Sequence, residues 1–244
     1  MTERGDFTGE AEAYARARPS YPSALVDRLV ERVGVREGDP VADLGAGTGL
    51  FTAQLAARRL AVTAVEPNAA MRAKAPPMSG VRFVEGTFEE TGLASASQRW
   101  ITVAHAFHWA DPDRALPELE RVLAPAGALS LLWNIRDELE SDVLAFTRAR
   151  IEELAPGFDE GYRDRDWAAV LGPVFDGVVV DEEPHTIAMS VERYLELWRS
   201  HHLLRRAIGE DAVAHLTGEL PRFLGTSDAI DVPYVCRAFT GFRR

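Results

Sequence analysis

Apolar and polar positions along the first half of the chain follow the pattern expected of strands that alternate with helices. Short apolar or β-rich runs predict five strands, at residues 41–44, 60–65, 81–85, 100–104 and 128–133. Helical patterns separate several of these strands, at residues 51–58, 68–75 and 112–122. Because alternating strands and helices form a parallel sheet through right-handed crossovers, this half predicts an α/β protein with a doubly wound sheet.

The segments on either side are less regular. Upstream, residues 8–17 can form a short helix, and residues 23–32 carry an apolar stripe that would pack on the sheet. Downstream, helical patterns are found at residues 139–154, 166–171, 190–198 and 211–220. Residues 178–187 are β-rich despite Pro184, and residues 232–239 predict a final strand.

Three glycines at alternate positions follow the first strand. Gly45, Gly47 and Gly49 lie between the apolar run that includes Asp43 and the next helical pattern. Without Cβ atoms they can take positive φ and let a ligand lie against the backbone, near the free N–H groups of the helix. The phosphate loop of a Rossmann fold uses the same physics, but its glycine spacing would require a third glycine at position 50, which is Leu50 here. The glycine spacing therefore does not fit a dinucleotide-binding loop.

Acidic and polar residues also follow the next two strands. Glu66 ends the second strand about twenty residues beyond Gly45, the offset at which a carboxylate reaches a ribose diol. Thr87 and Phe88 follow the third strand. Open parallel sheets bind ligands at the carboxyl ends of their strands, so these residues predict a site at that edge.

Composition limits the possible partners. The chain has 244 residues, of which 46% are hydrophobic, enough for a sizeable core. Its net charge of −11 disfavours nucleic acid as a partner. The single cysteine, Cys236, excludes an internal disulfide and a multi-cysteine zinc site. No apolar leader or run of about 18 apolar residues is found, so we expect a cytoplasmic monomer or homodimer with no membrane partner.

The acid and alternating glycines from Asp43 to Gly49 resemble motif I of the class I S-adenosylmethionine-dependent methyltransferases. The resemblance implies S-adenosyl-L-methionine as cofactor, S-adenosyl-L-homocysteine as product and a small-molecule acceptor methylated at oxygen, nitrogen or a carboxylate by in-line displacement. The cofactor-binding residues that it implies are Tyr14, Arg18, Asp43, Gly45, Ala46, Gly47, Glu66, Pro67, Met71, Thr87, Phe88 and Ala104.

The resemblance also implies roles for these residues. Glu66 would hold the ribose hydroxyls, the glycine turn would approach the methionine moiety, and Asp43 would orient the turn or the amino group. Thr87, Phe88 and Met71 would surround the adenine, although core packing explains Phe88 and Met71 equally well.

The N-terminal residues resemble a particular branch of the family. The spacing Phe7-x3-Ala-x2-Tyr14-x3-Arg18-Pro-x-Tyr21-Pro is similar to the opening of the small-molecule (type 11) branch that includes trans-aconitate methyltransferases. In that branch the segment covers the cofactor, so it predicts a lid that excludes water. A structural brace is the alternative.

The segment after the fourth strand carries the candidate catalytic residues. His105 and His108 precede Trp109, similar to a Phe-His-Trp signature of the same branch. Either imidazole could accept a proton from an acceptor near neutral pH, or it could position the acceptor only. We expect no metal, because no third ligand is clustered nearby.

The resemblance covers residues 7–137 and implies a Rossmann-like, doubly wound seven-stranded sheet, mostly parallel with an antiparallel last strand. We expect a single methyltransferase domain with N-terminal lid helices (1–36), a cofactor-binding core (37–137), a substrate cap with strand six (138–231) and a last strand (232–244). Candidates for the cap lining include Trp133, Asn134, Arg136, Trp198, His201 and His202.

Two other classes of protein share these features. An NAD-dependent oxidoreductase would have the same sheet but a different glycine spacing. A non-catalytic or repurposed S-adenosylmethionine-binding protein would retain every feature except turnover, because methyl transfer requires no obligatory catalytic residue.

Overall fold

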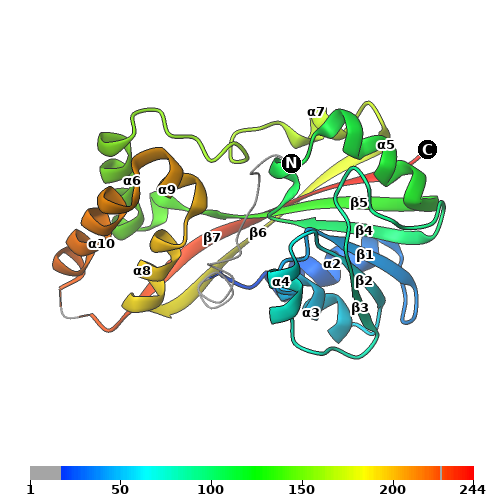
Figure 1. Ribbon diagram of the computed structural model, residues 1–244, viewed down its shortest axis with the longest axis horizontal. Helices are drawn as coiled ribbons and strands as arrows, with labels where there is room; N and C mark the ends of the chain where they lie inside the picture. Colours follow the sequence, from blue (N-terminus) through cyan, green and yellow to red (C-terminus); the bar gives the residue numbers. More distant parts are fainter. Residues whose placement is uncertain (1–17, 226) are drawn as a thin grey trace.

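A computed structural model of the protein describes residues 18–225 and 227–244, with a seven-stranded sheet at the centre (Figure 1). The strands are β1 (Pro40–Leu44), β2 (Ala61–Val65), β3 (Val81–Val84), β4 (Gln98–Ala104), β5 (Leu123–Arg136), β6 (Phe175–Ser190) and β7 (Ala229–Arg243). Their order is β3-β2-β1-β4-β5-β7-β6, and only β7 runs antiparallel to its neighbours. The predicted doubly wound seven-stranded sheet is confirmed.

Helices cover both faces of the sheet (Figure 1). One face packs against α2 (Ser23–Val33) and α3 (Leu50–Ala57), and the other against α5 (Pro112–Val122) and α7 (Trp167–Leu171). Side chains alternate between the two sides along each strand, so Trp100 packs with the first pair and Ile101 with the second. No helix of the described residues is both long and apolar enough to cross a bilayer.

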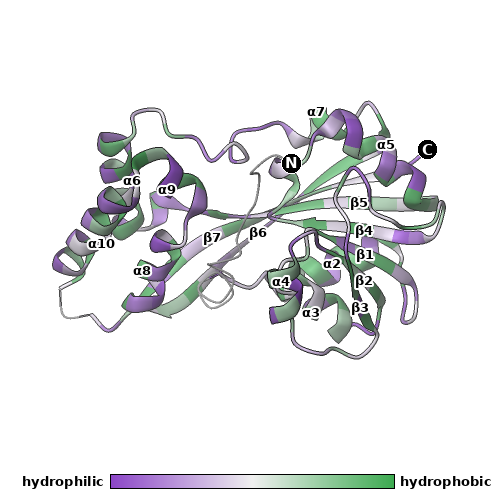
Figure 2. Ribbon diagram, in the orientation of Figure 1, coloured by the Kyte–Doolittle hydropathy of each residue, from purple (hydrophilic) through white to green (hydrophobic). Residues whose placement is uncertain are grey.

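A group of helices that we call the cap stands beyond the long strands β5, β6 and β7, at the left of Figure 1. The cap comprises α6 (Asp142–Leu154), α8 (Val191–Arg199), α9 (His202–Ile208) and α10 (Glu210–Leu224). Each helix carries hydrophobic and hydrophilic residues (Figure 2). Their apolar residues form a cluster with Val232 and Tyr234 of β7, so the extended sheet supports the cap.

Several elements differ from the sequence prediction. β6 continues through Pro184, which is tolerated because β6 is an edge strand. β5 begins at Leu123, five residues before the predicted strand at residues 128–133. The helix α9 was not predicted, because its cap is His201, whose Nδ1 accepts a hydrogen bond from the N–H of Leu204. Three short elements remain among the described residues: α4 (Ala69–Lys74) and the 3-10 helices Phe107–Trp109 and Glu138–Glu140.

Candidate functional site

The glycine turn joins β1 to α3 through three left-handed residues. The φ angles are 66° at Gly45, 57° at Gly47 and 87° at Gly49. A Cβ on Gly45 would lie 2.8 Å from the Cβ of Ala106 and 2.9 Å from the Cζ of Phe88, so no side chain fits there. A Cβ on Gly47 would have no atom of the described residues within 4 Å. The backbone at Gly47 therefore borders open space, as a ligand-binding turn requires.

Asp43 lies buried immediately before the turn. The hydroxyl of Thr52 donates to its Oδ2 at 2.6 Å, and the hydroxyl of Thr102 donates to its Oδ1 at 3.0 Å. Burial raises the pKa of Asp43 from its ordinary value of 3.8 to about 6, although both hydrogen bonds oppose the increase. The carboxyl group is therefore positioned by α3 and β4, and a cationic ligand group would favour its ionised form.

Glu66 connects the end of β2 to the same turn. The N–H of Gly47 donates to its Oε2 at 2.9 Å, and the N–H of Asn68 donates to its Oε1 at 2.9 Å. Burial raises the pKa of Glu66, and these two hydrogen bonds oppose that change. Since each carboxylate oxygen has a second lone pair, Glu66 can hold the turn and still accept from a ligand.

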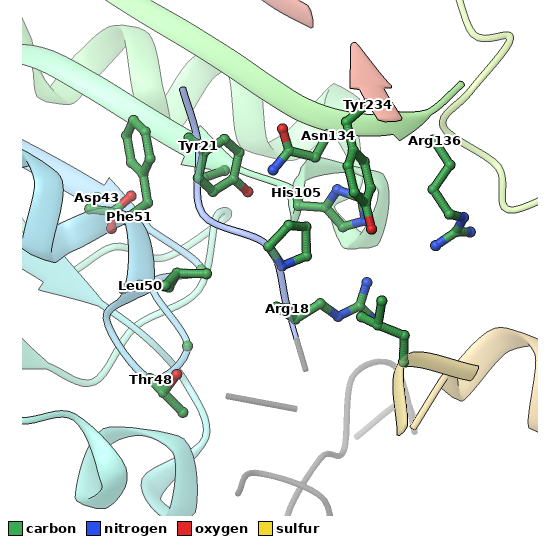
Figure 3. Close-up of a pocket in the computed structure, with 16 residues that line it drawn as sticks. Arg18, Tyr21, Asp43, Thr48, Leu50, Phe51, His105, Asn134, Arg136 and Tyr234 are labelled. Atoms are coloured by element: carbon green, nitrogen blue, oxygen red, sulfur yellow. The ribbon is translucent and has the colours of Figure 1, made fainter. Parts of the chain in front are cut away.

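The main cavity lies between the glycine turn, the segment that begins at Arg18, and the cap (Figure 3). The predicted cofactor-binding residues that line it are Arg18, Asp43, Gly45, Ala46, Gly47 and Ala104. The candidate catalytic residue His105 lines it as well. Sequence reasoning did not select Thr48, Leu197 and Tyr234, which also border this cavity.

The other predicted cofactor-binding residues are not part of this lining: Glu66, Pro67, Met71, Thr87 and Phe88. Met71 is buried in α4, and Phe88 packs edge to face against Phe107 with ring centroids 5.9 Å apart. Their predicted contacts with the adenine remain predictions. Tyr14 lies outside the described residues, as do the helix predicted at residues 8–17 and the rest of the predicted lid before Arg18.

His105 has an unusual backbone for its residue type. Its φ is 54°, in the left-handed region, and its N–H donates to the carbonyl oxygen of Leu132 at 2.7 Å. A non-glycine residue in this region costs free energy, and such residues cluster at functional sites. Burial, followed by the positive charge of Arg18, lowers the pKa of His105 well below its ordinary value. The imidazole is therefore neutral at physiological pH.

His108 lies beside the main cavity rather than in its lining. It borders a neighbouring cavity that shares Arg18 and His105 with the main one. The indole N–H of Trp133 donates to its Nδ1 at 3.4 Å, so the neutral ring carries its hydrogen on Nε2. Burial lowers the pKa of His108 from 6.5 to about 3, which favours the positioning alternative over proton transfer near neutral pH.

A metal site is not formed near these imidazoles. Within residues 18–225 and 227–244, no group of three histidine, cysteine, aspartate or glutamate side chains could hold a metal ion. The rings of His105 and His108 contact Tyr162 instead, with centroids 4.7 Å and 5.0 Å from it. Tyr162 therefore links the two imidazoles to a group of buried charges, because its hydroxyl donates to Glu160.

Those buried charges centre on Glu160. Its Oε1 accepts from Nη2 of Arg136 and from Nε2 of His201, each at 2.6 Å, and its Oε2 accepts from the hydroxyl of Tyr162 at 2.9 Å. Although burial opposes the change, Arg136 and His201 hold the pKa of Glu160 well below its ordinary value. Sequence analysis named Arg136 and His201 as cap candidates but missed Glu160, because it lies in an irregular segment without a pattern.

Comparisons with known proteins agree with this architecture. The family described as a methyltransferase domain matches residues 42–131. An uncharacterised methyltransferase of Mycobacterium tuberculosis is 45% identical over 136 residues, which cover 54% of this chain and 53% of that protein. An uncharacterised methyltransferase of Geobacillus kaustophilus is 31% identical over 165 residues, which cover 63% and 75%. A solved structure from Anaeromyxobacter dehalogenans, of a candidate type II methyltransferase, has a TM-score of 0.72 at 25% identity and covers 92% of this chain and 97% of that one.

The sheet order and the glycine turn with its flanking acids define the methyltransferase class of α/β protein. The chain belongs to the class I S-adenosylmethionine-dependent methyltransferase family. It spans about half the length of the mycobacterial relatives that it matches. The similarity to the trans-aconitate branch stays a prediction, since none of these three proteins is named for an acceptor.

Proposed function

We propose that this protein transfers a methyl group from S-adenosyl-L-methionine to a small-molecule acceptor bound between the sheet and the cap. The observation that carries the proposal is the main cavity, which joins the glycine turn and Asp43 at one end to polar cap-side residues at the other. One cavity therefore offers a place for the methyl donor and a separate place for the acceptor.

The described residues fit the cofactor. The backbone at Gly47 faces open space, and φ of 57° there favours glycine. Asp43 offers a carboxyl group to the cationic amino group of the methionine moiety, which would favour its ionised form. Glu66 would accept from the ribose hydroxyls with its remaining lone pairs, and Met71, Thr87 and Phe88 would surround the adenine.

When bound, S-adenosyl-L-methionine supplies a sulfonium methyl: the acceptor's lone pair forms the new bond to carbon, and the electrons of the broken C–S bond remain on sulfur. The protein must align the acceptor and exclude water. His108 suits the first task better than proton transfer, because a pKa of about 3 makes it a weak base. Its Nε2–H is available to orient the acceptor by donating a hydrogen bond.

Binding and turnover test the proposal separately. Calorimetric titration should show binding of S-adenosylhomocysteine and no comparable binding of NAD. Incubation with S-adenosylmethionine and a panel of small acids, alcohols and amines should then release S-adenosylhomocysteine with at least one acceptor. Binding without turnover across a broad panel would favour the non-catalytic alternative, and preference for NAD would contradict the cofactor assignment.

A further inference from the structure

Two buried polar groups at the cap end of the main cavity lack a hydrogen-bond partner within the described part of the chain. They are Nε of Arg136 and the hydroxyl of Tyr234. Arg136 is 8% exposed and Tyr234 is 2% exposed, and both side chains line the cavity. Buried polar groups are nearly always satisfied in folded proteins, so an unsatisfied pair that faces a cavity is available to hydrogen-bond a molecule that fills it.

The two groups are held next to each other by the sheet. Arg136 and Tyr234 are directly paired residues of the antiparallel strands β5 and β7, so their side chains emerge on the same face. In Figure 3 both point into the cavity on the side of Arg18, away from Asp43 and Thr48 at the glycine turn. A ligand group bound by both would therefore lie across the cavity from the turn.

The guanidinium of Arg136 is positioned before any ligand arrives. Its Nη2 donates to Glu160 at 2.6 Å, and its Cζ lies 4.4 Å from the ring centroid of Trp198. Glu160 is in turn held by His201 and Tyr162. Because these contacts use Nη2 and the flat face of the guanidinium, the Nε–H edge stays available to a ligand.

The local charge favours an anion. Three arginines lie close enough to Tyr234 to lower its pKa: Arg18, Arg136 and Arg193. One carboxylate, that of Glu160, acts in the opposite direction. Burial nevertheless raises the pKa of Tyr234, so its hydroxyl stays protonated and can donate. This concentration of arginines contrasts with the net charge of −11 for the whole chain.

The neighbouring amide does not compete for this role. The Nδ2 of Asn134 donates to the carbonyl oxygen of Ser20 at 3.1 Å, and its Oδ1 lies 3.0 Å from Nε2 of His185. Both the nitrogen and the oxygen of this amide therefore have protein partners, whereas Nε of Arg136 and the hydroxyl of Tyr234 have none among the described residues. The Nε–H of the charged Arg136 guanidinium and the hydroxyl of Tyr234 are two neighbouring donors, which suit two oxygens of one carboxylate or phosphate group.

We propose that the methyl acceptor carries an anionic oxygen group, a carboxylate or a phosphate, which accepts hydrogen bonds from Nε of Arg136 and the hydroxyl of Tyr234. This inference rests on the proposed function for calling the ligand an acceptor, but the anion site itself does not. The group serves to anchor and orient the molecule, and it makes Arg136 and Tyr234 specificity-determining residues.

The test titrates malonate, citrate and inorganic phosphate into the protein at constant ionic strength, with and without saturating S-adenosylhomocysteine. We expect at least one of them to bind, with malonate and citrate reporting a carboxylate site and phosphate reporting a phosphate site. Tyr234→Phe removes only a hydroxyl that has no hydrogen-bond partner among the described residues, so it should fold normally and weaken anion binding by about tenfold. Arg136→Lys keeps a charge beside Glu160 but removes the Nε–H, and it should weaken binding at least as much.

A matched control is Tyr194→Phe, which removes a buried cap hydroxyl that contacts Thr147 and does not line the cavity. It should leave anion affinity unchanged, and all three variants should bind S-adenosylhomocysteine as the unmodified protein does. Absence of anion binding in both arms, or equal binding by Tyr234→Phe and the unmodified protein, would overturn the anion site. Failure of the unmodified protein to bind S-adenosylhomocysteine, with anion binding intact, would instead overturn the proposed function.

Discussion

The carboxylate of Glu66 accepts a hydrogen bond from the backbone N–H of Gly47 at 2.9 Å. The acid at the end of β2 therefore holds the turn that follows β1, and two motifs separated in the sequence act as one unit. This contact gives Glu66 a structural task besides its proposed contact with the ribose. Both tasks use the side-chain oxygens of Glu66 as acceptors, and the ionised form offers the most acceptor sites.

Replacing Glu66 with alanine should weaken binding of S-adenosylhomocysteine tenfold or more. The change removes an acceptor of hydroxyl hydrogen bonds, worth on the order of 1.5–3 kcal/mol each when charge-assisted, and it releases the N–H of Gly47. Calorimetric titration measures the change, with Glu85→Ala as control, since Glu85 is exposed after the neighbouring strand and pairs with Arg72. Equal affinities of Glu66→Ala and the unmodified protein would refute the ribose assignment.

Gly47→Val should abolish cofactor binding while the fold largely survives. The added side chain would enter the open space beside the turn, and φ of 57° would be strained for valine. Gly38→Val provides the control, because Gly38 also has a positive φ and open space around it but does not line the cavity. Far-UV circular dichroism should report similar folds, and only Gly47→Val should lose S-adenosylhomocysteine binding. Binding by Gly47→Val would show that no ligand lies against this backbone.

Asp43 should make stability fall as the pH rises from about 4 to above 6. The pKa of its buried carboxyl is raised from 3.8 to about 6, so the folded protein binds this proton more tightly than the unfolded chain. The resulting stabilisation is fully present below about pH 3.8 and is lost as the pH rises through about 6, in total on the order of 3 kcal/mol.

Asp43→Asn should remove this pH-dependent contribution. Urea unfolding of the ligand-free protein between pH 4 and 8 measures it as the difference between the two stability curves, with the exposed Asp164→Asn as control. Parallel curves for Asp43→Asn and the unmodified protein would contradict the raised pKa. The same variant should bind S-adenosylhomocysteine more weakly, since asparagine lacks the negative charge that would attract the cationic amino group of the ligand.

His108→Asn should reduce turnover by less than about tenfold and leave the pH profile above pH 5 unchanged. With a pKa of about 3 the imidazole is neutral throughout that range, so its removal costs positioning rather than proton transfer. Release of S-adenosylhomocysteine with a working acceptor measures turnover, and replacement of the exposed His215 by asparagine is the control. A general base would instead give a loss of about 10² to 10⁴, an acidic limb near the ordinary histidine pKa and rescue by added imidazole.

Features that depend on neighbours along the chain were predictable from the sequence. The glycine turn adopts the expected left-handed conformations, and Ser190 caps α8 by accepting from the N–H of Arg193. The five strands of the first half and their helices were found near the predicted positions, because periodicity and turn chemistry act over a few residues. The family resemblance added the expectation of seven strands with an antiparallel last strand.

What the tertiary structure decided depends on residues far apart in the sequence. The pairing of Arg136 with Tyr234 follows from the register of β5 on β7, which no local pattern encodes. The pKa of His108 follows from its burial, and burial depends on how η1 (Phe107–Trp109) meets the cap-side segments. The sequence by itself therefore determined the class of protein and the turn that we propose binds the cofactor, because both depend on the spacing of residues that are close together in the sequence. Only the folded chain could bring Glu160, Arg136 and Tyr234 to one end of a cavity, because long-range packing sets their positions and their charge environment.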